Sequence, residues 1–136
     1  MPIDISPLVN AVARLEEGYA RYMQDITDQQ IRDGLIQRFE FTYDLSDKML
    51  KRFLEETSAT PEVIDQMSFQ SRIRTGNEQE LLLNDWSRWK HYRDMRNVTS
   101  HTYDETKALI VVAGIPDFIE EVRFLRDKLA ARIAAA

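Results

Sequence analysis

Apolar side chains recur at intervals of three and four positions along almost the whole chain. This spacing is that of one face of an α-helix, whereas a half-buried β-strand would alternate apolar and polar residues. The longest uninterrupted example runs from about residue 29 to residue 56, where there is no proline and Gly34 is the only glycine. At 1.5 Å per residue, such a helix would be a rod of about 40 Å. Its apolar stripe is wide enough to contact two neighbouring helices, as in a bundle.

Residues that start or stop helices divide the rest of the chain. Pro61 is typical of the first turn of a helix, and it predicts a short helix that ends at Gly76. Asn77 with Glu80 three residues later has the form of a capping box, in which two side chains satisfy free N–H groups at a helix start. This pair predicts the start of a further helix that carries Trp86.

Thr102 with Glu105 is a second capping box and predicts the start of the last helix. Gly114 and Pro116 should kink or break that helix, because proline lacks an N–H group and its ring collides with the preceding turn. The expected fold is all-α: an up-and-down antiparallel bundle of four main helices plus one short helix.

The composition is that of an ordinary globular protein. The chain has 136 residues, which suits a single domain over residues 1–136. It has no cysteine, which excludes disulfides, zinc–thiolate sites and cysteine nucleophiles. The N-terminus lacks the regions of a signal peptide, and the longest apolar run, residues 108–115, is too short to cross a bilayer. We therefore expect a cytoplasmic protein that does not associate with membranes.

The formal net charge of −5 argues against a protein whose whole surface binds nucleic acid. A local site is still compatible with this charge. Between residues 86 and 101, the basic side chains outnumber the acidic ones: Arg88, Lys90, Arg93 and Arg96 against Asp94. A solvated helix face with a few basic residues would give the same composition.

Residues 96–103, which we call the octet, read Arg-Asn-Val-Thr-Ser-His-Thr-Tyr. Arg96 carries a permanent charge and can hold a phosphate through two hydrogen bonds. His101 can move a proton near neutral pH. This combination is expected where phosphodiester or phosphoryl chemistry takes place. The alternative is that Asn, Thr and Ser are present because they favour helix ends, where a half-buried histidine is also common.

On one unbroken helix, Arg96 and His101 would lie about 140° apart around the axis and could not contact the same phosphate. The capping box at Thr102 predicts that the helix ends near Thr99 or Ser100, which places His101 in a turn. Pairing of two octets across a twofold axis is a second way to bring the two side chains together. Both solutions remain open on the sequence alone.

The octet also carries a resemblance to a known family. Arg96 and His101, separated by four residues, match the HEPN signature. Residues 96–105 resemble the Arg-Asn-Leu-Thr-Ser-His-Thr-Tyr-Asp-Glu block of nucleotidyltransferase substrate-binding proteins, which are HEPN partners of minimal nucleotidyltransferases. Residues 35–50 resemble the second helix of that family, although Asp44 stands where glutamate is expected and Asp47 where tryptophan is expected.

The resemblance implies a two-gene module in which a metal-independent ribonuclease toxin pairs with a minimal nucleotidyltransferase encoded nearby. Arg96 and His101 would be the catalytic pair, acting on RNA without a cofactor or metal. Asn97 and Arg93 are the candidates for orienting the substrate. Tyr103 would accept AMP from the transferase, which would silence the site. The resemblance also implies a homodimer whose two octets face across a cleft.

Two alternatives come from other classes of function. The chain could be a substrate-binding or regulatory subunit of the nucleotidyltransferase with no catalysis of its own. It could also be a helical dimerisation module in which the octet has no chemical role. The acidity of the chain favours these alternatives, whereas the density of reactive side chains in the octet favours the ribonuclease.

Overall fold

The structure is a computed structural model that describes residues 3–136, and every regular element in that range is helical. The expected all-α bundle is confirmed. The elements, in chain order, are α1 (Ser6–Gln24), α2 (Gln29–Thr57), α3 (Pro61–Asp65), α4 (Phe69–Glu78), α5 (Trp86–Asn97), the 3₁₀ turn η1 (Thr99–His101) and α6 (Glu105–Ala135).

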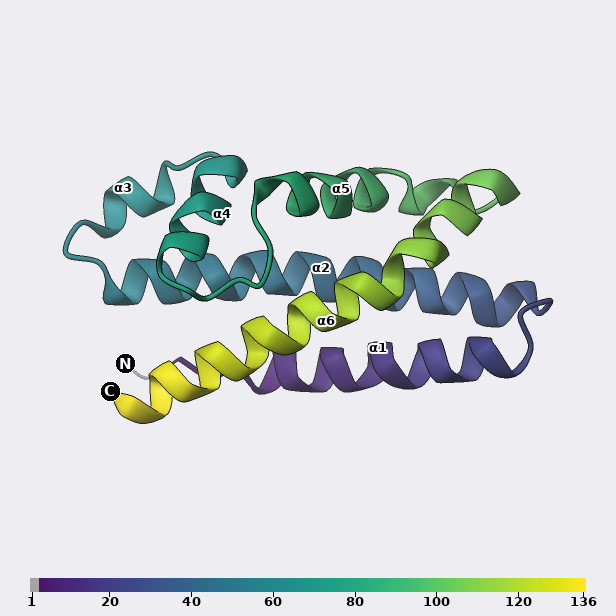
Figure 1. The fold of residues 1–136 in the computed structure, drawn as a ribbon, viewed down its shortest axis with the longest axis horizontal. Helices are drawn as coiled ribbons and strands as arrows, with labels where there is room; N and C mark the ends of the chain where they lie inside the picture. The colour runs from purple at the N-terminus through teal and green to yellow at the C-terminus, as the bar shows by residue number, and fades with distance from the viewer. Residues whose placement is uncertain (1–2) are drawn as a thin grey trace.

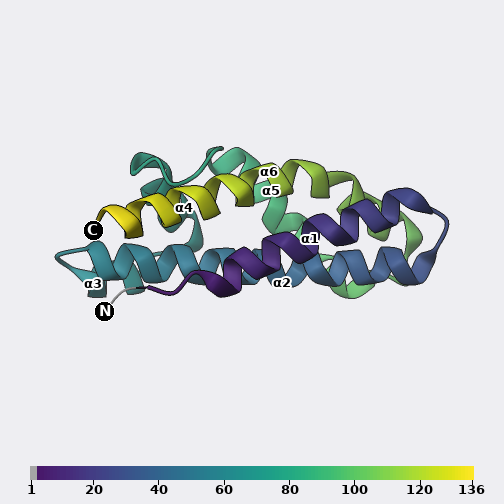
Figure 2. The same cartoon turned by 90° about the horizontal axis from the view of Figure 1, so that it is seen from below.

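The long helix α2 is the centre of the bundle, because it contacts α1, α3, α4, α5, α6 and η1. Figure 1 shows α1 and α2 as an antiparallel hairpin, α5 lying along α2, and α6 crossing the molecule diagonally back towards the N-terminal end. The view from below in Figure 2 shows α2 and α6 on opposite sides of the bundle, with α1 crossing obliquely between the two levels. The junction of α5 and α6 therefore lies near the α1–α2 turn, at the end opposite to α3.

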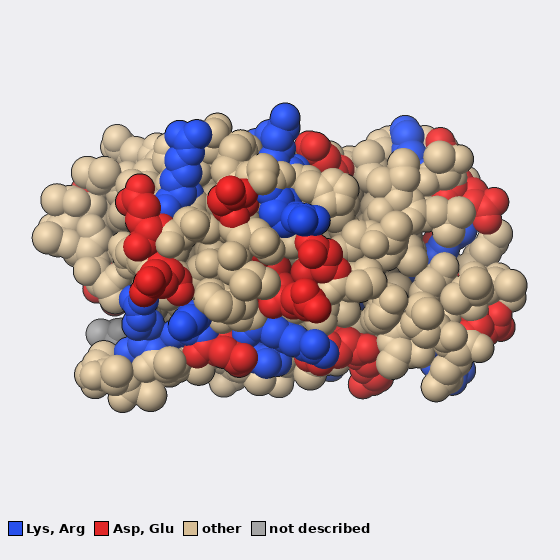
Figure 3. Space-filling view, in the orientation of Figure 1, with Lys and Arg blue, Asp and Glu red and all other residues tan. Residues whose placement is uncertain are grey.

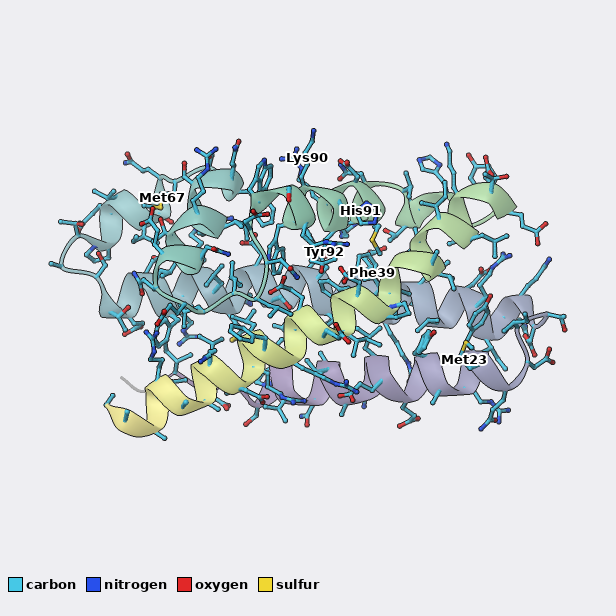
Figure 4. All side chains as sticks on the ribbon, in the orientation of Figure 1. Met23, Phe39, Met67, Lys90, His91 and Tyr92 are labelled. Atoms are coloured by element: carbon cyan, nitrogen blue, oxygen red, sulfur yellow. The ribbon has the colours of Figure 1, made fainter. Side chains whose placement is uncertain are left out.

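Helix α2 forms where the apolar pattern predicted it. Asp28 caps its start by accepting hydrogen bonds at Oδ1 from the backbone N–H groups of Gln30 and Ile31, at 3.0 and 3.1 Å. Aromatic residues join α2 to α5 and α6: the ring of Phe118 lies 4.8 Å from that of Phe39 and 5.1 Å from that of Tyr92. Figure 4 shows Phe39 and Tyr92 pointing into the interior between these helices.

The expected single short helix is two helices, α3 and α4. Ser68 separates them and caps α4, since its Oγ accepts from the N–H of Ser71 at 3.1 Å. Gly76 lies inside α4 rather than at a helix end. The bundle therefore has four main helices, α1, α2, α5 and α6, and two short ones.

The predicted helix start at Asn77 and Glu80 is wrong. Glu80 adopts a φ of 62°, in the left-handed region, and a loop follows until Asp85 caps α5. The buried carboxylate of Glu121 holds this loop by accepting from the backbone N–H groups of Leu83 and Asn84, at 2.7 and 3.1 Å. Burial raises the pKa of Glu121, against these hydrogen bonds, which lower it.

Helix α6 continues through Gly114 and Pro116, so the expected break does not occur. Gly114 has a packing role instead, because a Cβ atom there would lie 2.5 Å from Sδ of the buried Met95. The absent side chain lets α6 approach α5 closely, just before the octet. None of the helices within residues 3–136 has the length and apolar character needed to cross a membrane.

Candidate functional site

The octet breaks the chain between two helices, as predicted. Helix α5 ends at Asn97, the 3₁₀ turn Thr99–His101 follows, and α6 begins at Glu105. The cap of α6 is Asp104, whose Oδ1 accepts from the N–H of Lys107 at 3.2 Å, and not Thr102 as the sequence suggested. Asp104 is the closer residue to the first helical turn. His101 thus lies in a turn beyond the end of α5.

Arg96 faces two acids on α2. Its Nε and one terminal nitrogen donate to the two carboxylate oxygens of Asp44, at 2.8 and 3.0 Å. Glu40, one turn away on α2, has an oxygen 3.7 Å from the guanidinium. The hydrogen bond and charge of Asp44 raise the pKa of Arg96 further above its ordinary value. The guanidinium is therefore oriented and charged, and it already holds a carboxylate in the two-point manner in which it would hold a phosphate.

Thr99 completes this network. Its hydroxyl donates to Glu40 at 2.7 Å and accepts from the guanidinium of Arg96 at 3.2 Å. Sequence reasoning missed Glu40 and gave Thr99 only a helix-end role. The available signal was that Glu40 and Asp44 are four residues apart, on one face of a helix. The sequence does not say which arginine they meet.

His101 and Tyr103 are joined to each other. Nδ1 of His101 lies 3.2 Å from the hydroxyl of Tyr103, and the two rings meet edge to face at 5.8 Å. His101 is half-buried, whereas Tyr103 exposes 84% of its surface. The contact occupies Nδ1, so Nε2 is the nitrogen left for a substrate. The phenol remains accessible from solvent.

The other predicted site residues lie on α5. Asn97 is exposed and, among the described residues, has no side-chain hydrogen bond. Arg93 lies over the ring of Trp86, 5.1 Å from its centroid. Within residues 3–136 of one chain, no hydrogen bond joins Arg96 to His101, so the structure brings together Arg96 with Asp44 and His101 with Tyr103, but not the two catalytic candidates directly.

Helix α2 also holds the far end of the octet. The side chain of Arg32 is buried, and a terminal nitrogen donates to the carbonyl oxygen of Thr102 at 3.4 Å. A second contact joins Arg32 to Glu105 at 3.7 Å. Arg32, Glu40 and Asp44 thus fix the octet along one side of α2.

The charge of the surrounding surface is mixed. Acidic and basic side chains alternate over the face drawn in Figure 3, without a broad basic area. No group of three His, Asp or Glu side chains in the part of the chain that the structure describes is close enough to hold a metal ion.

A helical bundle that presents an Arg-x4-His motif between its last two main helices defines a HEPN-type protein. Residues 3–131 match the family described as Nucleotidyltransferase substrate binding protein like. The chain belongs to this family.

The chain is similar to a curated protein and to a solved structure, both from Haemophilus influenzae. One, named probable ribonuclease HepT, is 46% identical over 99 residues, which are 73% of this chain and 67% of that protein. The other is a solved structure, HI0074, described as the fold of a substrate binding domain of a nucleotidyltransferase. It is 36% identical, has a TM-score of 0.87, and the match covers 93% of this chain and 99% of that one.

Proposed function

We propose that the protein is a metal-independent ribonuclease toxin whose octet cleaves RNA and is silenced when Tyr103 is adenylylated. The observation that carries the proposal is the position of the octet: a turn with a half-buried histidine and an exposed tyrosine directly follows the helix end that carries an oriented arginine. The name of the relative, a probable ribonuclease, supports the same reading.

The reaction is an attack by a ribose 2′-OH on its own phosphate. The bond from the 2′ oxygen to phosphorus forms, and the bond from phosphorus to the 5′ oxygen of the next nucleotide breaks. His101 accepts the 2′-OH proton or returns one to the departing 5′ oxygen through Nε2. Arg96 stabilises the negative charge that builds on the phosphate oxygens.

Arg96 has to release a carboxylate in order to bind the phosphate. The side chain of Asp44 is 53% exposed, so it can turn towards solvent without losing buried contacts. A phosphate offers the guanidinium the same two-point hydrogen bonding as the carboxylate. We therefore assign Asp44 the role of holding Arg96 in place until RNA binds.

Silencing follows from the exposed Tyr103 hydroxyl. In the adenylylated protein, the oxygen that now contacts His101 carries a phosphate. The added negative charge and bulk would exclude the RNA phosphate from the site. The proposed enzyme for this step is a minimal nucleotidyltransferase encoded nearby, in line with the family to which the chain belongs.

Purified protein tests the proposal in buffer with a metal chelator and labelled single-stranded RNA. We expect wild-type protein to cut the RNA, and Arg96→Ala or His101→Ala to lower the rate by about 10²- to 10⁴-fold. His91→Ala is the matched control, because His91 is exposed on α5 and lies outside the octet. Cleavage that persists in both octet variants would overturn the proposal.

A second candidate function is a binding subunit that presents substrate to the nucleotidyltransferase without catalysis. The engagement of Arg96 by Asp44 favours it, since an arginine held by a carboxylate can serve recognition as well as catalysis. This candidate predicts a stable complex with the transferase and no RNA cleavage by either protein alone.

A further inference from the structure

A row of side chains on α5 has no part in the contacts of the octet with α2. Trp86, Lys90, Arg93 and Asn97 follow one another at intervals of four, three and four residues. They therefore lie within a sector of about 60° on the surface of the helix. The row extends about 16 Å from the start of α5 to the octet, which begins at Arg96.

Arg93 is a cation without a carboxylate partner within residues 3–136. The two acids that act on Tyr43 by charge, as Arg93 also does, are each held by another arginine. Asp44 is held by Arg96 at 2.8 and 3.0 Å, and Asp47 by Arg72 through two contacts of 3.0 Å. The charge of Arg93 is thus available to an external anion.

Lys90 is the second such cation. It is exposed, and Figure 4 shows it projecting away from the bundle. Asp94 lies one turn further along α5, but no ion pair forms between the two in the described part of the chain. In Figure 3, basic side chains project at the upper margin, over the α4 and α5 edge. On an otherwise acidic protein, this edge is complementary to a polyanion.

Trp86 provides an aromatic surface at the start of the row. It is half-buried, with its ring edge to face with Phe69 at 5.7 Å and with the guanidinium of Arg93 above it at 5.1 Å. It also borders a hollow of about 420 Å³, whose walls include Arg74 and Asn77. An aromatic ring beside a hollow and next to unpaired cations is the arrangement on which proteins stack unpaired bases.

We propose that this row is a subsite for single-stranded RNA, in which an unpaired base stacks on the side of Trp86 that borders the hollow, and the phosphates between that base and the octet contact Lys90 and Arg93. Glu78 and Asp85 also line the hollow. Carboxylates accept hydrogen bonds from base amino groups and repel phosphate, so the hollow suits a base and not a backbone. The inference rests on the proposed ribonuclease function and adds that the substrate is unpaired at this point, because a duplex keeps its base faces stacked.

The test measures binding apart from cleavage. In a His101→Ala background, the affinity for a short fluorescein-labelled oligoadenylate is compared with that for the same strand annealed to its complement. We expect the single strand to bind more tightly. Trp86→Leu should weaken its binding roughly 5- to 150-fold. Lys90→Ala should weaken binding and lower the slope of log affinity against log salt by about one.

Matched variants separate binding from folding. Arg93→Ala should weaken binding, whereas Arg88→Ala should not, since Arg88 lies on another face of α5 and pairs with Asp117 at 3.4 Å. Trp86→Phe keeps an aromatic ring and should retain most of the affinity. Oligoadenylate should also quench the tryptophan emission of the protein but not that of the Trp86→Phe variant, because the remaining Trp89 is only 1% exposed.

Equal affinities for single strand and duplex, or for Trp86→Leu and its parent, would overturn the subsite. The experiments distinguish failure of the subsite proposal from failure of the ribonuclease proposal. If wild-type protein cuts RNA while Trp86 is dispensable for binding, the ribonuclease stands without this subsite. If binding depends on Trp86 but no RNA is cut, the subsite stands and the cleavage proposal fails.

Discussion

At the scale of single residues, Tyr103 and His101 of the octet differ sharply in their exposure to solvent. Tyr103 is almost fully accessible, whereas its hydrogen-bond partner His101 is half-buried in the 3₁₀ turn. The phenol can therefore reach the active site of another protein while the imidazole stays in place. This separates the residue that would be modified from the residue that would do the chemistry.

Replacing Tyr103 with Phe is expected to uncouple silencing from cleavage. The variant keeps the ring and loses the oxygen that would receive AMP, so RNA cleavage should persist in the presence of the nucleotidyltransferase and ATP. Intact mass measurement after that incubation should show addition of AMP to wild-type protein and none to the variant. Tyr19→Phe is the control, and it should still be modified. Modification of Tyr103→Phe at wild-type level would place the acceptor elsewhere.

The sequence singled out candidate reactive residues, but it did not predict their contacts. Arg96 and His101 stand out by residue type, and the break between them was predicted from local helix-end residues. The partners of Arg96 were not predictable, because Asp44 is 52 residues away from it in sequence and any arginine of the chain could have met it. Long-range ion pairs depend on how helices dock, which residue types alone do not encode.

At the scale of helices, the agreement between predicted and observed boundaries depends on whether the residues that fix a boundary are close to it in sequence. Helix α2 was predicted almost to the residue, because its apolar period and the cap at Asp28 are local signals. The loop between α4 and α5 was not predicted. The loop there is held by the buried Glu121, which lies on α6 and is 37 residues from Asn84. A buried carboxylate in the middle of an apolar helix face gives no indication in the sequence of which backbone it will bind.

Replacement of two glycines in helix interiors by alanine should change the stability of the protein in opposite directions. A Cβ at Gly114 would meet the buried Met95, whereas a Cβ at Gly34 has no atom within 4 Å. Gly114→Ala should therefore destabilise the protein by about 1–3 kcal/mol through overpacking. Gly34→Ala should stabilise it by about 0.5–1 kcal/mol, because alanine loses less backbone entropy in a helix. Urea unfolding followed by circular dichroism measures both, and a stabilising Gly114→Ala would contradict the close approach of α5 and α6.

At the scale of the whole molecule, the expected homodimer has a candidate interface beside the octet. Leu109 and Ile110, in the second turn of α6, are 46% and 52% exposed. Two large apolar side chains at the surface next to reactive residues are typical of a face that another protein covers. A dimer built on this face would bring two octets together, as the resemblance implies.

Ile110→Glu tests this interface. A charge at the centre of an apolar contact is costly to bury, so the variant should sediment as a monomer where wild-type protein sediments at twice the mass of one chain. The matched control is Val63→Glu on α3, at the opposite end of the bundle, where the side chain is 55% exposed and the dimer should survive. A wild-type monomer, or a dimer that tolerates Ile110→Glu, would contradict the prediction.

The three anchors of the octet on α2 have a consequence for a chain that is still being synthesised. Asp44, Glu40 and Arg32 lie 52, 59 and 70 residues before the octet groups that they bind. When α1 and α2 have emerged from the ribosome, the nascent chain presents the three anchors but neither Arg96 nor His101. The arginine and histidine acquire their positions only after α5 and the turn behind it have emerged and docked. For the proposed ribonuclease, activity would thus arise only late in synthesis, after α1, α2 and α5 have emerged.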